Sequence, residues 1–129
     1  MSYAVERADI ESRLKAGWTT TAIAWDNIPY VPTPGTSWIR CTILPGDSEA
    51  LEFGTDTLKQ YSGMIDIGIF TPRDIGSATA RGYADTLLNL FDMETFGSIE
   101  CDEVFIRNLG IDGYWYHMSV TIPFKRREI

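Results

Sequence analysis

The chain has 129 residues, 44% of them hydrophobic and 22% charged, with a formal net charge of −7. This length suits a single domain with one core, so we expect residues 1–129 to form one unit. The acidic balance argues against a general nucleic-acid-binding surface, which needs clustered Lys and Arg. No stretch approaches the roughly 18 apolar residues of a membrane span, and the N-terminus lacks a signal-peptide core. We therefore expect a cytoplasmic product without a membrane segment.

The first third of the chain predicts a helix, a strand and a loop. Residues 2–16 contain no Gly or Pro and repeat large side chains at helical spacing, which predicts a short amphipathic helix. Its stripe consists of Tyr3, Arg7, Ile10 and Leu14. Residues 18–25 are rich in Trp, Thr and Ile, a composition that predicts a strand. Residues 26–35 hold three prolines and a glycine, which predict a long, stiff loop.

Three further strands are predicted in the middle of the chain. Residues 37–44 alternate between two faces, one of them strongly apolar, and residues 45–47 read as a turn. Residues 49–55 and 60–71 are the next two strand candidates. Within the second of these, Gly68 indicates a bulge or a close approach of another part of the chain.

The second half of the chain predicts one helix and a hairpin. Residues 76–91 place apolar side chains at helical spacing with polar ones opposite, which predicts an amphipathic helix lying across a sheet. Residues 98–109 and 114–124 read as two strands joined through residues 110–113. The order of elements predicts an α+β fold with a largely antiparallel or mixed sheet. The N-terminal helix and the second amphipathic helix should pack on this sheet, whose strand order stays open.

Few residues in the sequence could carry catalysis. His117 is the only histidine, and no Ser lies in a Gly-x-Ser-x-Gly elbow. Cys41 and Cys101 are 60 residues apart in apolar stretches, so we interpret both as buried free thiols, with a disulfide or a reactive thiol as the alternatives. Either could pair with His117 only through the fold. We therefore expect no catalytic residues and no enzymatic activity.

The sequence also contains no recognisable motif for a metal or phosphate site. Acidic residues gather at Asp47, Glu49 and Glu52, but this segment lacks the ligand spacing and the central glycine of a calcium loop. It is better interpreted as a solvated acidic edge. Gly110–Gly113 is too short for a phosphate-binding loop and suits a turn. We expect neither a metal nor a cofactor.

Aromatic and proline residues concentrate between Trp18 and Trp38, a stretch with three of the four tryptophans and also Tyr30. Trp and Tyr are favoured at protein interfaces, yet they also make good cores, and core is the better interpretation for any single one of them. The loop of residues 26–36 taken as a whole is different, because long loops lie at the surface and often carry functional contacts.

The ordering of motifs in this region resembles a known family. Trp-Asp-Asn-Ile-Pro is followed by Pro-Thr-Pro-Gly and by Trp-Ile-Arg, all between Trp18 and Arg40. Ile-Leu-Pro-Gly ends at Gly46, Gly-Met-Ile-Asp-Ile-Gly-Ile-Phe precedes Pro72, and Ala-Asp-Thr-Leu-Leu begins at Ala84. This pattern is similar to that of the tail terminator-like proteins of long-tailed bacteriophages. The similarity weakens in the C-terminal hairpin.

The resemblance implies a structural virion subunit with no catalytic residues. Such a subunit assembles with copies of itself, by the family pattern as a hexameric ring, on the end of the tail tube. It stops polymerisation of the tube protein and offers a surface to the head–tail connector. DNA passes through the channel of the ring without specific binding, and a net negative subunit would keep that channel non-adhesive. The resemblance places the protein in the virion tail, after assembly in the host cytoplasm.

Together, the stiff loop and the resemblance give a set of candidate interface residues, namely Trp25, Asp26, Asn27, Pro29, Tyr30, Trp38 and Arg40. Two alternatives stay open. One is another head–tail adaptor or tail-completion subunit, which would share the size, charge and ring assembly. The other is a small ligand-binding domain or enzyme with a site between helix and sheet, supported only by His117 and scattered carboxylates.

Overall fold

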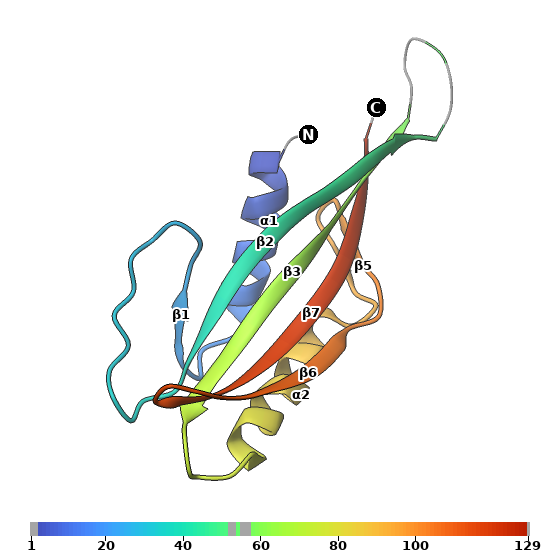
Figure 1. Cartoon of the computed structure of the whole chain (residues 1–129). Coiled ribbons are helices and arrows are strands. Elements are labelled where there is room, and N and C mark those ends of the chain that lie inside the picture. Colours follow the sequence, from blue (N-terminus) through green and yellow to red (C-terminus); the bar gives the residue numbers. More distant parts are fainter. Residues whose placement is uncertain (1–2, 52–53, 55–57, 129) are drawn as a thin grey trace.

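The computed structural model describes residues 3–51, 54 and 58–128. Within these residues, two helices and seven strands form an α+β fold, as the sequence predicted (Figure 1). In chain order the elements are α1 (Tyr3–Gly17), β1 (Ala22–Ala24), β2 (Trp38–Ala50), β3 (Lys59–Pro72), α2 (Ala78–Phe91), β4 (Thr95–Phe96), β5 (Ile99–Cys101), β6 (Phe105–Asp112) and β7 (Trp115–Glu128).

The strands form one mixed sheet in the order β1-β2-β3-β7-β5-β4, and β6 also pairs with β7. β1 runs parallel to β2, whereas every other pairing is antiparallel. The long strands β2, β3 and β7 form the centre, and β5 and β6 share the far edge of β7. The expected C-terminal hairpin is present as β6 and β7.

Both helices lie on one side of this sheet (Figure 1), and the core fills the space between them. Alternate residues of a strand point to opposite faces, so each central strand contributes every second side chain. Ile65, Ile67 and Ile69 of β3 are fully buried there, beside Leu87 and Phe91 of α2. Full burial of such a side chain stabilises the fold by about 1.5–3 kcal/mol. The predicted amphipathic helix is thus confirmed as α2.

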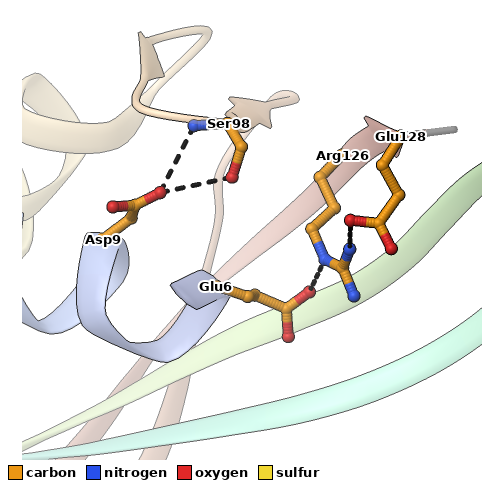
Figure 2. Close-up of polar contacts among 5 residues, drawn as sticks. All are labelled: Glu6, Asp9, Ser98, Arg126 and Glu128. Carbon is orange, nitrogen blue, oxygen red and sulfur yellow. Dashed lines mark hydrogen bonds and ion pairs between the residues drawn. The ribbon is translucent and has the colours of Figure 1, made fainter. Parts of the chain in front are cut away.

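Helix α1 is held to the sheet by a buried cation (Figure 2). The Arg126 side chain of β7 is 1% exposed, and its Nε donates a hydrogen bond of 2.8 Å to Glu6 Oε1. Its Nη1 forms an ion pair with Glu128 at 2.8 Å. The guanidinium also lies between the rings of Tyr3 and Tyr61, with its Cζ atom 4.9 and 4.2 Å from the ring centroids. Burial alone would lower the pKa of Arg126, but the two carboxylates outweigh this effect and raise it.

This cluster corrects the predicted stripe of α1. Ile10 and Leu14 are buried as expected, but Arg7 is exposed and Glu6 is buried in its place. The reason is that the buried guanidinium needs a carboxylate facing the sheet. A second polar link joins α1 to the turn between β4 and β5, where Asp9 Oδ2 accepts hydrogen bonds from the backbone N–H and the hydroxyl of Ser98 (Figure 2).

Two strand predictions and one turn prediction differ from the structure. The strand expected at residues 18–25 shortens to β1, because the buried Trp18 side chain bonds to Thr21 and the chain turns there. The turn expected at residues 45–47 is instead a register shift between Pro45 and Ser48, through which β2 continues to Ala50. The strand expected at residues 49–55 is therefore the end of β2 as far as Ala50, and most of its remainder lies outside the described residues.

The strand expected at residues 98–109 is divided into β5 and β6. Pro123 of β7 lies opposite the division, and its carbonyl accepts a 2.8 Å hydrogen bond from the backbone N–H of Asp102. The N–H and C=O of one strand residue point to the same edge, so proline leaves no donor on this side of β7. The ladder along β7 is interrupted at that point.

Both cysteines are free and buried, in agreement with the sequence interpretation. Burial is the main cause that raises the pKa of Cys41 to about 12, and nearby carboxylates, Glu11 first, add to it. Burial also raises the pKa of Cys101 to about 12, although the charge of Arg13 opposes the rise. Both thiols are thereby kept protonated at neutral pH.

Candidate functional site

The side of the sheet that faces away from the helices is the main candidate for an interaction surface, and we call it the helix-free face. An antiparallel sheet with one open side usually shows polar residues there. Here the open side carries large aromatic and apolar side chains among the polar ones. The residues on it are Trp38, Arg40, Thr42 and Leu44 of β2, Met64, Asp66, Gly68 and Phe70 of β3, Trp115, His117, Ser119, Thr121 and Pro123 of β7, and Phe105 and Arg107 of β6.

An aromatic row crosses three strands at one end of this face. Trp38, Phe70 and His117 are direct neighbours in the register of β2, β3 and β7. The rings of Trp38 and Phe70 stack with centroids 4.2 Å apart, and Phe70 and His117 stack at the same distance. Tyr30 packs against Trp38 at 5.1 Å, and Trp115 meets it edge-on at 6.0 Å. Such rings offer a rigid contact surface at little entropic cost.

The next row of residues across the sheet has an arginine at each end and two small residues between them. Arg40, Gly68, Ser119 and Arg107 are successive neighbours across β2, β3, β7 and β6. Both arginines are exposed, whereas Gly68 and Ser119 are buried. A Cβ atom at Gly68 would lie only 3.0 Å from His117 Nε2 and from the Phe70 ring. The sequence signal at Gly68 therefore reflects close packing, since the strand register runs through it without a bulge.

The far end of the face is an apolar groove with a volume of about 420 Å³. Leu44 and Met64 remain 48% and 46% exposed there, beside Pro123. Nearby, Phe105 of the edge strand β6 is 56% exposed. Among the described residues, two polar atoms of this face, Trp38 Nε1 and Thr121 Oγ1, lie buried without a hydrogen-bond partner. Large exposed apolar side chains in one area mark a surface for association.

Three of the seven candidate interface residues meet on the helix-free face. Tyr30 lies partly buried on Trp38, which is 5% exposed. The Arg40 side chain extends over the same ring, with its Cζ atom 5.4 Å from the centroid. Although these residues are up to ten positions apart in the sequence, their side chains pack together.

The other four candidates lie elsewhere. Trp25 is partly buried against the core and borders a hollow lined by α1. Asp26 is exposed, and its Oδ2 accepts a 3.2 Å hydrogen bond from the backbone N–H of Ile43. Asn27 and Pro29 are exposed, and Asn27 has a φ of 59°, in the left-handed region that Asn tolerates. Asp26 thus ties the loop to the outer edge of β2, and Asn27 and Pro29 are left accessible.

Sequence reasoning missed four members of the helix-free face, namely Phe70, Trp115, Arg107 and His117. Alternation along residues 114–124 puts Trp115 and His117 on the same side of their strand. What was lacking was the pairing of β7 with β3 and of β3 with β2, which brings these side chains to Trp38. Arg107 gave no local signal of its own.

The geometry separates the groups that could have formed a nucleophilic pair. Cys41 and Cys101 point to the helix side, where they belong to the core, and His117 lies on the helix-free face. The sheet therefore stands between each thiol and the imidazole. Burial lowers the pKa of His117, and the charges of Asp112 and Asp66 oppose this shift. The lowered pKa favours the neutral ring, which stacks on Phe70.

Candidate metal ligands do not converge in the part of the chain that the structure describes, where no group of three or more His, Cys, Asp or Glu side chains could hold an ion. Asp47 and Glu49 are exposed, and Glu52 lies outside the described residues. Neither described helix has both the length and the apolar character needed to cross a membrane.

Comparisons with known proteins identify the family. The family model described as "Phage tail terminator protein" matches residues 6–124. A solved structure that is 20% identical superposes with a TM-score of 0.74, covering 98% of this chain and 96% of its own, and so shares the fold. None of the curated protein sequences matches the chain. Because the family model spans the helices, the sheet and the helix-free face, the chain belongs to the phage tail terminator protein family and is a structural component of a phage tail.

Proposed function

We propose that this chain caps the end of the tail tube, stops polymerisation of the tube protein and provides the surface to which the head connector joins. The observation that carries the proposal is the family match over residues 6–124, which includes the whole helix-free face. We further propose that the active form is a ring of identical subunits, six by the family pattern, with a channel through which DNA passes.

The helix-free face and the loop of residues 26–36 supply the contacts in this proposal. Most of the loop is exposed, with Val31 87% and Ile28 58% accessible. Its prolines restrict the free chain, so docking it costs less conformational entropy. Aromatic and arginine side chains dominate the energetics of many interfaces, and Trp38, Tyr30 and Arg40 are of these types. The net charge of −7 supports a channel that does not retain DNA.

A tube-elongation assay tests the proposal. Purified tail tubes are incubated with tube subunits, with and without this protein, and tube lengths are measured by negative-stain microscopy. We expect added protein to arrest elongation and to give density at tube ends. A variant with residues 26–36 replaced by a Gly/Ser linker of equal length should remain folded by circular dichroism and lose this activity. Tubes that elongate equally with and without the wild-type protein would refute the capping role.

The same assay distinguishes a tail terminator from the alternative function, another head–tail adaptor or tail-completion subunit. A head–tail adaptor or completion subunit would leave elongation of bare tubes unchanged and would bind only tails that already carry a terminator. Adding the protein to terminated and to unterminated tails therefore distinguishes the two functions by which tail population it binds.

A further inference from the structure

The hairpin formed by β2 and β3 is acidic. Residues 41–58 contain four acidic residues and no Lys or Arg. Two of the four, Asp47 and Glu49, are in β2 and exposed. Among the described residues, neither forms an ion pair within 4.0 Å. Leu51, just beyond them, is 42% exposed.

The helix-free face, in contrast, carries exposed basic side chains. Arg40 and Arg107 are exposed, and within the described part of the chain neither has a carboxylate partner. Three strand spacings separate them, about 14 Å across the sheet. Between them lie the buried residues Gly68 and Ser119, which carry no charge, and Phe105 of the neighbouring row is an exposed apolar contact.

The geometry of the sheet prevents the carboxylates of the β2–β3 hairpin from pairing with Arg40 or Arg107 of the same molecule. Arg40 and Glu49 belong to the same strand, nine residues apart, so at about 3.3 Å per residue they are held on the order of 25–30 Å from each other. Arg107 is on β6, three strands away from β2. The carboxylates and the arginines can therefore meet only between two molecules.

We propose that the segment Asp47–Leu51 of one copy docks on the helix-free face of a second copy, where its two carboxylates pair with Arg40 and Arg107. Leu51 then meets the exposed apolar side chains beside this row, Phe105 among them. The contact is heterologous, since the donor segment and the accepting face are different surfaces, and such contacts form a ring when the rotation between copies closes. This inference rests on the proposed self-assembly and names the surfaces that form it.

Reciprocal charge reversal provides the test. In the first variant Asp47 and Glu49 are both changed to Arg; in the second, Arg40 and Arg107 are both changed to Glu. Each variant alone places like charges together, so its association constant should fall by about 100-fold or more. An equimolar mixture should recover association, because the reversed segment fits the reversed face and the unchanged surfaces fit each other. A chain with all four changes should also associate.

The readouts are sedimentation velocity over a range of concentrations and occupancy of tube ends in micrographs. A matched control changes Lys15 and Arg81, two exposed bases on the helices, to Glu. This variant has the same net charge as the second one and should associate as the wild type does. Unchanged association of either charge-reversed variant, or failure of the mixture to recover, overturns the inference.

The outcomes also separate this inference from the proposed function. If the wild type arrests tubes and both variants arrest them equally well, the docking surface is wrong and the capping role stands. If association follows the charge pattern but tubes elongate freely, the docking surface stands and the capping role fails. If the wild type neither associates in solution nor occupies tube ends, both are refuted.

Discussion

On the helix-covered side of the sheet, Ile65, Ile67 and Ile69 are fully buried, whereas on the helix-free side the flanking Met64 is 46% exposed and Phe70 only partly buried. Both sets come from one strand. The alternation of side chains sends one set to the core and the other to the open surface. The same strand therefore contributes to stability through one face and is available for association through the other.

Charged residues show the same contrast. Arg126, on the helix-covered side, has two carboxylates and two aromatic rings around its guanidinium. Arg40 and Arg107, on the helix-free side, have no carboxylate partner in the described chain, although Arg40 lies over Trp38. A buried cation must be paired within the fold, whereas an exposed cation remains free to pair with a carboxylate of another molecule. The comparison shows that the fold pairs the buried arginine on the helix-covered side and leaves the exposed arginines of the helix-free side without an ionic partner among the described residues.

The largest effect should come from removing a charge on the covered side. Arg126→Ala leaves Glu6 buried without its cation, which should lower the free energy of unfolding by about 3–5 kcal/mol. Urea denaturation followed by circular dichroism measures this change. The matched variant Arg107→Ala, on the helix-free face, should stay within roughly 0.5 kcal/mol of the wild type. Equal losses for the two variants would contradict the proposed division between the sides.

A leucine pair sharpens the comparison for apolar side chains. Leu87 of α2 is fully buried and Leu109 of β6 is 49% exposed. Leu87→Ala should cost about 3 kcal/mol, since it removes buried surface and leaves a cavity. Leu109→Ala should cost well under about 1 kcal/mol by the same reasoning. Thermal unfolding of both variants at one pH decides the matter, and a large loss for Leu109→Ala would mean that β6 is part of the core.

The smallest effect concerns pH. Burial lowers the pKa of His117 from its ordinary value of 6.5, so the folded protein favours the neutral ring. The stability that this contributes is present above pH 6.5 and is lost as pH falls through the lower pKa of the folded state. His117→Phe keeps a stacked ring without titration, and its unfolding free energy should fall less between pH 7 and pH 5. Identical pH profiles would show that His117 is not desolvated.

A structural feature could be predicted from the sequence where the interactions that determine it are between residues close together in the chain. Helix α2 and the two faces of β7 follow from local periodicity, and the proline-rich loop follows from the lack of donors and the fixed φ of proline. The burial of Glu6 in place of Arg7 was not readable, because the residue that requires it, Arg126, lies 120 positions away. The continuation of β2 past Pro45 depends in the same way on its pairing with β3.

The sequence by itself determined the α+β class, the two cysteines as buried thiols, the exposed loop of residues 26–36 and, through motif order, the resemblance to tail terminators. Only the tertiary structure decided which side chains share the helix-free face. Trp38, Phe70 and His117 come from three strands, and their stacking depends on the register of two antiparallel pairings. A shift of one residue in either pairing would turn a strand's side chains to the opposite face, and register is fixed by the packing of the whole core.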